Sequence, residues 1–369
     1  MFAGSNRALR VVFLGSHVDP FLIQEEVPIP ELKSGEILGK IRMATICGSD
    51  LHTISGRRKE AVPSILGHEG VIELIEHKRP ADSGLKKGDR LTFHVVNCCG
   101  KCERCKDGLQ QKCLSLFKYG HAAIMKNSEL NGCYASHIII HSGTHVVKVP
   151  DHLQDRIASP INCALATMIS AVSGLNGRGS NRETSAFIQG CGLLGIYGCV
   201  LLREAGFNKV FCSDVNVDRL DMVQKFGGIP LQAGQRTSEG PEDSSVDVVI
   251  EIYCGSKKTS GTRVCGVRDV ISEGITLVRP GGLYVLIGMV HPDSKLDLTG
   301  EQIIRKCITI KGIHNYSPQH LDEAVSFLSR TYIKYPYKEL FSQPFKLADF
   351  QTALKLAQQQ KFYRVCVVP

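Results

Sequence analysis

The most conspicuous chemical feature of the sequence is a group of five cysteines in the stretch VVNCCGKCERCKDGLQQKCL, residues 95–114. Two registers of four cysteines fit this stretch, beginning at Cys98 or at Cys99. The second register separates the thiols by two, two and seven residues, with glycine at positions 100 and 108 where the loop must turn sharply. Four thiolates on so short a loop predict a closed tetrahedral zinc site. Its ligands would be Cys99, Cys102, Cys105 and Cys113. An iron–sulfur cluster is the alternative, because closely spaced cysteines also bind iron.

A four-thiolate site has no vacant position for a substrate, so we expect it to brace a loop, with Cys98 as a packing residue. Chemistry would need an open site, and its ligands can come from TICGSDLH, ILGHEG and PINCALAT, which supply Cys47, His68 and Cys163. One imidazole and two thiolates, with a fourth position left for water or an alcohol, form a known catalytic zinc arrangement. Each of these residues taken singly is more often a core or surface residue than a ligand.

A glycine-rich stretch offers a second kind of chemistry, the binding of a dinucleotide. The sequence GCGLLG directly follows the strand-like SAFIQ and directly opens a helical stretch. In this setting the glycines permit a tight turn, a close approach of the backbone to a pyrophosphate and close packing of helix on strand. The predicted cofactor residues here are Gly190, Gly192, Leu193, Leu194 and Gly195.

The acid that would accept hydrogen bonds from the cofactor ribose is predicted at Asp214. It ends the second strand-like segment, KVFCSD, nineteen residues after Gly195. Because a carboxylate there would repel a 2′-phosphate, NAD is favoured over NADP. The alternative is that Asp214 only caps the helix that follows. Arg219 completes the predicted cofactor set.

The elements that must position these residues fall into two kinds. The first 160 residues consist mainly of short extended segments broken by turns, which predicts a β-rich, barrel-like domain. From about residue 185, strand-like and helical segments alternate, which predicts a parallel, doubly wound sheet of the α/β class. After about residue 314 the pattern is mixed again, with a helix-like HLDEAVSFLSR.

Composition limits the class of protein. At 369 residues and 43% hydrophobic, the chain can bury a large core and form two domains. The net charge of +8 is spread mainly over single basic residues, and the strongest clusters, Arg57-Arg58-Lys59 and Lys86-Lys87, are short. This pattern predicts a solvated basic surface and no nucleic-acid partner, although a mildly positive field would also favour an anionic ligand.

The sequence also predicts a cytoplasmic protein without a membrane span. No apolar run reaches about eighteen residues, and the N-terminal stretch MFAGSNRALRVVFLGS makes a poor signal peptide. Fifteen cysteines without a secretory signal indicate a reducing compartment, where thiols serve as metal ligands or core residues.

Five motifs together carry a resemblance to a known family. CGSDLH, GHEG, the cysteine cluster, NCALAT and GCGLLG occur in the order and approximate spacing of zinc-dependent medium-chain dehydrogenases, the alcohol dehydrogenase superfamily. The resemblance runs nearly end to end. It implies a GroES-like catalytic domain over residues 1–164 and 314–369, interrupted by a Rossmann NAD-binding domain over residues 165–313. The active site is expected in the cleft between the two domains.

The resemblance also implies roles for single residues. Cys47, His68 and Cys163 resemble the ligands of a catalytic zinc, which with the four-cysteine site makes two zinc ions per chain. Glu69 resembles the family's acid beside the metal, and Asp50 the carboxylate that orients the histidine ligand.

Four further residues match positions around the reaction. Ser49 and His52 match a proton relay found in some members. Thr167 resembles a residue near the nicotinamide, and Arg364, in FYRVCVVP, resembles an arginine that reaches the cofactor pyrophosphate.

The resemblance predicts an oxidoreductase that transfers a hydride between an alcohol, or its aldehyde or ketone, and NAD. A homodimer or homotetramer is expected. Cys163 matches the alcohol dehydrogenase branch, whereas polyol and threonine dehydrogenases commonly carry glutamate there. The run CGSDLHTISGRRKE also resembles a branch found beside phosphonate-catabolism genes.

Alternatives are a polyol or amino-alcohol dehydrogenase of the same superfamily, a non-catalytic NAD-binding protein derived from a dehydrogenase, a zinc-free reductase and a zinc-finger nucleic-acid binder. The last leaves the alternating strands and helices unexplained. The substrate itself is not predicted.

Overall fold

The computed structural model describes residues 6–125, 129–177, 182–235, 237–238, 240–252, 267–288, 296 and 298–369. The chain divides into two compact units. Unit 1 comprises residues 1–166 and 316–369, and unit 2 comprises residues 167–315. Each unit is described by itself below.

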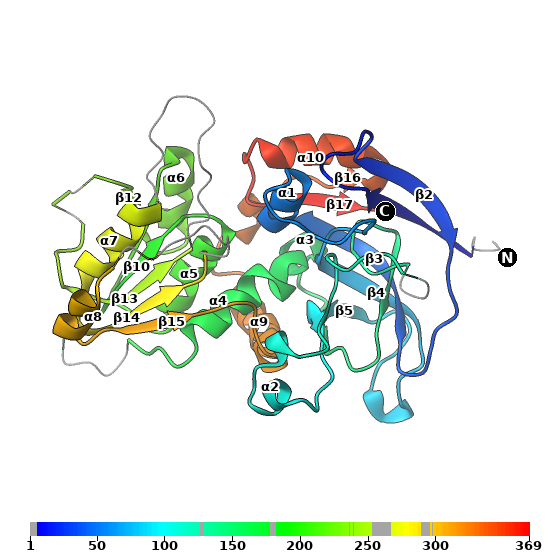
Figure 1. Cartoon of the computed structure of the whole chain (residues 1–369), viewed down its shortest axis with the longest axis horizontal. Coiled ribbons are helices and arrows are strands. Elements are labelled where there is room, and N and C mark those ends of the chain that lie inside the picture. The colour runs from blue at the N-terminus through cyan, green and yellow to red at the C-terminus, as the bar shows by residue number, and fades with distance from the viewer. Residues whose placement is uncertain are drawn as a thin grey trace. The chain divides into compact units, whose positions relative to one another are not determined.

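Unit 1 is built on a seven-stranded sheet in which β3 pairs with three other strands (Figure 1). The path runs through β16 (Phe345–Lys346), β17 (Val365–Val368), β3 (Ile37–Ile46), β4 (Glu69–His77), β5 (Arg90–Phe93) and β9 (Val146–Lys148), with β8 (His137–Ile140) also on β3. Two small sheets accompany it, β1 (Arg7–Phe13) with β2 (Leu22–Pro28) and β6 (Val96–Asn97) with β7 (Phe117–Lys118). The helices assigned to unit 1 are α1 (Gly48–Ile54), α2 (Glu103–Lys106), α3 (Asp155–Ala158), α9 (Pro318–Thr331) and α10 (Phe350–Gln358).

The C-terminal segment completes unit 1 because β17 pairs antiparallel with β3. The pairing joins residues more than 300 positions apart, Val365 with Ile46 and Val367 with Ala44. Both strands bury apolar side chains in the core of this unit, which also includes Ile72 and Leu91 from the neighbouring strands. The core therefore depends on both ends of the sequence.

Unit 2 is a six-stranded parallel sheet with helices packed against it (Figure 1). The strand order is β12 (Ile229–Gln232), β11 (Lys209–Asp214), β10 (Ser185–Gln189), β13 (Val246–Glu251), β14 (Val278–Leu286) and β15 (Thr309–Gly312). Every residue of β13 is buried, as expected for a central parallel strand. The helices are α5 (Leu193–Glu204), α6 (Val217–Lys225), α7 (Val267–Leu277) and α8 (Gly300–Lys306), and α4 (Ala164–Val172) spans the boundary of the units.

The strand order of unit 2 places its first strand, β10, in the middle of the sheet, and the chain then continues to either side of it. This is the order of a Rossmann fold, whose ligands bind where the order reverses. The predicted α/β class, with a β-rich domain and a doubly wound parallel sheet, is confirmed. Within this sheet β14 is an interior strand, because it pairs with both β13 and β15.

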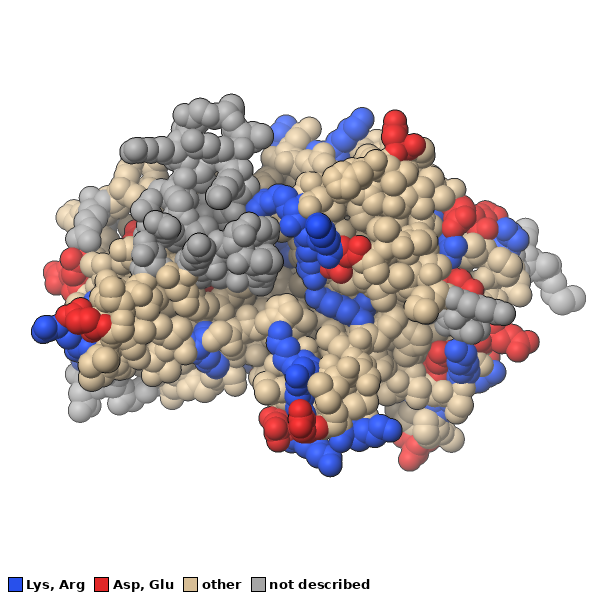
Figure 2. Space-filling view, viewed as in Figure 1, with Lys and Arg blue, Asp and Glu red and all other residues tan. Residues whose placement is uncertain are grey.

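Every cysteine in the described part of the chain is free. Within the same residues, none of the helices combines the length and apolar character needed to cross a bilayer. On the face seen in Figure 2, basic side chains occur singly or in short groups, and acidic side chains stand beside several of them.

Candidate functional site

The first metal-binding group lies on the loop around α2. The sulfur atoms of Cys99, Cys102, Cys105 and Cys113 all lie within 4.8 Å of one another. Cys102 and Cys113 flank short helical turns, and the glycines at positions 100 and 108 have φ of +68° and +79°, which favours glycine. Cys98 is half-buried and not part of the group.

Backbone N–H groups point at the sulfurs of this loop, as they do where thiolates are the resting form. The N–H of Cys99 donates to Cys113 Sγ at 3.3 Å, and that of Cys102 to Cys99 Sγ at 3.4 Å. Hydrogen bonds from the backbone of Leu114 and Cys105 lower the pKa of Cys102 to about 6. Four soft sulfur donors this close together fit a zinc ion.

The second group brings together Cys47, His68, Glu69 and Cys163, whose ligand atoms also lie within 4.8 Å of one another. Cys47 follows β3 and precedes α1, His68 precedes β4, and Cys163 follows a 3-10 turn over residues 159–162. Adjacent pairing of β3 with β4 joins Thr45 to Glu69, which brings the first two ligands to one end of the sheet. Asn162 donates to the carbonyl of His68 at 2.9 Å and so ties the third segment to the second.

Asp50 holds the imidazole of His68. Its Oδ1 lies 3.5 Å from His68 Nδ1, and its Oδ2 accepts hydrogen bonds from the hydroxyl of Tyr134 at 2.7 Å and the N–H of Cys47 at 3.0 Å. Burial would lower the pKa of His68, but the Asp50 carboxylate and the Cys47 thiol raise it to about 10. With Nδ1 turned to Asp50, the other ring nitrogen is left for a metal.

The two thiols of the second group differ in charge. A hydrogen bond from Cys163 and the nearby charge of Arg364 lower the pKa of Cys47 well below its usual range, whereas the same hydrogen bond and burial raise that of Cys163. Binding of a cation would release the protons of the His68 imidazole and the Cys163 thiol, because metal ligands bind in their deprotonated forms. The donor set therefore fits zinc.

Glu69 is held by Arg364 and Thr45. The Nε and Nη2 of Arg364 donate to the two carboxylate oxygens at 2.7 and 2.8 Å, and the Thr45 hydroxyl donates at 2.7 Å. Nη2 also lies 3.4 Å from Cys47 Sγ, and Nη1 donates to the carbonyl of Tyr363. Arg364 thus contacts the metal-binding group in unit 1, and its predicted contact with a pyrophosphate stays a prediction.

Three predicted catalytic residues are placed as follows. Ser49 and His52 lie three residues apart on α1, immediately after Cys47, and are half-buried. Such a spacing puts both on one side of the helix. Thr167 is buried on α4 and is the first residue of unit 2.

The glycine-rich loop has the local geometry of a phosphate-binding turn. Gly190 follows β10 with φ of +116°, and Gly192 is the N-cap of α5 with nothing within 4 Å of where a Cβ would stand. A Cβ on Gly195 would collide with the carbonyl oxygen of Gly190. Leu193 and Leu194 open the helix, so free N–H groups face the space beside Gly192. The loop fits a dinucleotide.

Asp214 ends β11 beside this loop. Its Oδ2 accepts from the N–H of Cys191 at 2.8 Å and lies 3.8 Å from Arg219, and its Oδ1 accepts from the N–H of Asn216 at 2.9 Å. The side chain of Asn216, not that of Asp214, caps α6 by accepting from Asp218. Asp214 therefore braces the glycine-rich loop, in addition to any contact with a ribose.

Sequence reasoning missed the partners of the predicted site residues. Tyr134 and Thr45 hold the two carboxylates, and the ring of His121 lies 4.9 Å from that of His68. Tyr134 and His121 lie outside the motifs, and only the fold brings them to the site. Thr45 begins the stretch TICGSDLH, but its hydrogen bond to Glu69 depends on the pairing of β3 with β4.

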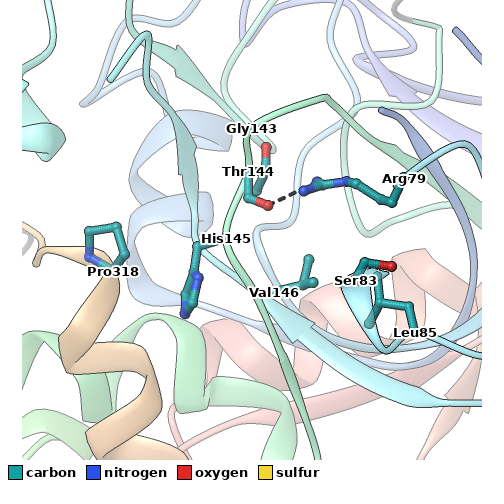
Figure 3. A pocket seen from close by; sticks show the side chains of 8 residues that line it. All are labelled: Arg79, Ser83, Leu85, Gly143, Thr144, His145, Val146 and Pro318. Atoms are coloured by element: carbon teal, nitrogen blue, oxygen red, sulfur yellow. Dashed lines mark hydrogen bonds between the residues drawn. The ribbon is translucent and has the colours of Figure 1, made fainter. Parts of the chain in front are cut away.

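A pocket of about 410 Å³ lies elsewhere in unit 1 and contains none of the predicted site residues (Figure 3). Arg79 points across it and donates to the carbonyl oxygens of Thr144 at 2.9 Å and His141 at 3.1 Å. These bonds stabilise the turn before β9. Arg79 therefore has a structural role in this turn.

Two family models match the sequence. Residues 33–151 match the alcohol dehydrogenase GroES-like domain, and residues 194–330 match the zinc-binding dehydrogenase domain. Among curated relatives, an L-threonine 3-dehydrogenase of Vibrio cholerae is 27% identical over 333 residues, which span 88% of this chain and 89% of the relative.

Solved structures agree in fold. An alcohol dehydrogenase from Thermotoga maritima is 26% identical, with a TM-score of 0.86 over 98% of this chain and 99% of that one. Acetophenone reductase from Geotrichum candidum, in complex with NAD, is 20% identical, with a TM-score of 0.77 over 99% and 98% of the two chains.

Proposed function

Because the chain belongs to the zinc-type medium-chain dehydrogenases, a family of NAD-linked zinc oxidoreductases, we propose that its hydride transfer occurs at the group formed by Cys47, His68 and Cys163. The observation that carries the proposal is that these three ligands meet, although they come from three separate segments between positions 47 and 163, and that the carboxylate of Asp50 lies beside the imidazole. The cysteine group on the α2 loop is the separate structural site, which gives one zinc at each of two groups.

The residues around the ligands have distinct tasks. Asp50 orients the imidazole of His68 and offsets positive charge on it. Arg364 and Thr45 donate hydrogen bonds to both carboxylate oxygens of Glu69. Because these oxygens are already hydrogen-bonded, Glu69 would lie beside the metal without binding it. A zinc ion held there would act as a Lewis acid on the substrate oxygen.

A proton must leave the substrate hydroxyl as it is oxidised. Ser49 lies two residues after Cys47 and is placed to accept it, and His52 lies one turn further along α1. An imidazole exchanges protons near neutral pH, so His52 can pass the proton to solvent. The glycine-rich loop would hold a nicotinamide cofactor, which would supply the hydride acceptor, and Thr167 is the residue predicted to lie near it.

The substrate class proposed is an alcohol or its carbonyl counterpart. The relatives named L-threonine 3-dehydrogenase are 27% identical, and Cys163 matches the alcohol dehydrogenase branch instead. The carboxylate of Asp214 favours NAD over NADP. The alternative of a non-catalytic NAD-binding protein is disfavoured because both metal-binding groups are complete.

The proposal also covers the cellular compartment and the oligomeric state of the enzyme. Free thiols and a metal-binding cysteine loop favour the cytoplasm. A homodimer or homotetramer could form through β15, which is an edge strand of the parallel sheet in unit 2.

The test is a variant that removes one ligand. His68→Ala should lower kcat/KM for alcohols by about 1000-fold, since the Lewis acid is lost, and should remove one zinc per chain while NADH binding persists. Cys98→Ser, next to the other metal group, is the control and should retain both zinc ions and turnover. Normal turnover by protein shown to lack zinc at the first group would refute the assignment.

A further inference from the structure

The pocket of about 410 Å³ in unit 1 is lined by none of the residues of the metal-binding groups or of the glycine-rich loop (Figure 3). Its walls come from both parts of unit 1, because Pro318 begins α9 whereas the other lining residues lie before position 147. Leu85, Val146 and Pro318 give the pocket apolar surface, and Arg79 points across it. Pockets of this volume hold small organic ligands.

Arg79 brings a positive charge to this pocket without a counter-charge. Its Nη2 donates to the carbonyl oxygens of His141 and Thr144, and its Nε is buried without a hydrogen-bond partner. No carboxylate from the described part of the chain pairs with this guanidinium. Because carbonyl oxygens carry no net charge, a guanidinium that is half removed from water still needs an anion nearby.

Two acids reach the same turn, but both are directed at histidines. Oε1 of Glu36 lies 3.3 Å from Nδ1 of His141, and Oδ2 of Asp322 lies 2.8 Å from Nε2 of His145. These carboxylates therefore do not compensate Arg79, and its charge is available to a ligand in the pocket.

The turn that forms one wall of the pocket is held by further hydrogen bonds. The side chain of Asn97 donates to Thr144 Oγ1 at 2.8 Å and to the carbonyl of Ser142 at 2.6 Å, and the hydroxyl of Tyr119 lies 2.8 Å from the same Oγ1. Tyr119 and Thr144 are both buried. A ligand would thus meet a wall that is already ordered, which lowers the entropic cost of binding.

We propose that this pocket binds a small organic monoanion, a carboxylate with an apolar body. The carboxylate would accept from Nη1 of Arg79, which donates to none of the described residues, and the apolar body would lie against Leu85, Val146 and Pro318. One uncompensated positive charge matches a monoanion better than it matches the two charges of a phosphate monoester. The site is a second ligand site, apart from the one at which we propose hydride transfer.

The experiment titrates the zinc-loaded full chain with benzoate and with its neutral counterpart benzamide, and follows binding by NMR of the ligand. The wild type should bind benzoate more tightly than benzamide by about 5-fold or more. Ser83→Asp places a like charge at an exposed position of the pocket and should weaken benzoate binding by about 10-fold, with little effect on benzamide. Ser83→Lys should strengthen it.

The matched control is Ser326→Asp, which makes the same charge change at an exposed position of α9 outside the pocket and should bind benzoate as the wild type does. Arg79→Met should also weaken benzoate binding by about 10-fold. Because that variant loses two hydrogen bonds of the turn, the Ser83 variants keep the test independent of any effect on folding.

Benzoate that binds at a zinc ion is distinguished from benzoate in this pocket because its affinity does not change with residues 79 and 83. Equal affinities for benzoate and benzamide, or the same benzoate affinity in Ser83→Asp, Arg79→Met and wild type, would overturn the inference. Inorganic phosphate is the third probe, and tighter binding of phosphate than of benzoate, with the same dependence on Ser83, would overturn the assignment to a monoanion. No readout uses turnover, so the result is independent of the proposed function.

Discussion

The guanidinium of Arg364 is buried against Glu69 and Cys47, and each of its three nitrogens donates a hydrogen bond. Burial raises the pKa of Glu69, and Arg364 opposes that rise. One residue from the far end of the chain therefore favours the ionised form of this carboxylate against the effect of burial. This pair links the stability of unit 1 to the electrostatics of the metal group.

Arg364→Met should lower the free energy of unfolding by about 3–5 kcal/mol, because it leaves the buried carboxylate of Glu69 unpaired. Urea unfolding of the wild type, the single variant and the double variant Arg364→Met/Glu69→Gln measures the effect. The double variant should recover most of the loss, whereas Arg7→Met, at an exposed ion pair, should change little. If the single and double variants lost the same free energy of unfolding, the proposed pairing of Arg364 with Glu69 would be contradicted.

Asp214→Asn should weaken the preference for NAD over NADP by about 10-fold, since the repulsion of a 2′-phosphate is removed. The measurement is kcat/KM with each cofactor at saturating alcohol. Asp218→Asn, four residues along on α6, is the control. An unchanged preference would mean that Asp214 serves only to brace the N–H of Cys191.

Among the elements, the loop around α2 is the one that we expect to depend on a metal. It contains only a four-residue helix and a short 3-10 turn, and Leu109, Leu114 and Leu116 are exposed. Little apolar burial is available to fix such a loop, so its stability must come from the four thiolates and their ion.

Cys105→Ser should remove the structural zinc and lower the melting temperature by more than about 5 °C, because one of four ligands is lost. Cys47→Ser should instead first lower the rate. Calorimetric melting with zinc analysis compares both variants with Cys98→Ser. A Cys105→Ser protein that melts like Cys98→Ser would contradict the structural assignment.

A charge cluster holds three strands of unit 2 together. Asp247, in β13, accepts from the N–H of Ser185 in β10 at 2.9 Å and from Nε of Arg279 in β14 at 2.6 Å, and also pairs with Arg182. Burial would raise the pKa of Asp247, but these donors, with Arg182 first, lower it.

Asp247→Asn should lower the free energy of unfolding by about 1–2 kcal/mol at neutral pH. Because the folded-state pKa is depressed, the contribution is present above the usual aspartate pKa of about 4 and is lost as pH falls through the lower folded value. Unfolding curves across pH should therefore converge for wild type and variant in acid. If the difference in the free energy of unfolding between wild type and variant stayed constant with pH, the charge of Asp247 would not be its cause. Asp221→Asn, at an exposed position, is the control.

For the whole molecule, the division into two units separates the candidate metal-binding groups from the predicted cofactor loop. Both metal groups lie in unit 1, and the glycine-rich loop with Asp214 lies in unit 2. Removal of zinc by a chelator should abolish turnover and destabilise unit 1, while NADH binding, followed by fluorescence, should change by less than about three-fold. Loss of NADH binding in step with zinc would contradict this separation.

The sequence by itself determined the family and the α/β class, and it predicted the members of each ligand set. Those features depend on local spacing: the cysteines of the loop are close in the chain, and GCGLLG between strand and helix predicts its own turn. The family models and relatives confirm the class of enzyme.

Only the tertiary structure decided which groups set the charges of those residues. Arg364 meets Glu69 because β17 pairs with β3, and Tyr134 reaches Asp50 although 84 positions separate them. Such contacts depend on long-range strand pairing and on burial, and no local spacing in the sequence encodes them.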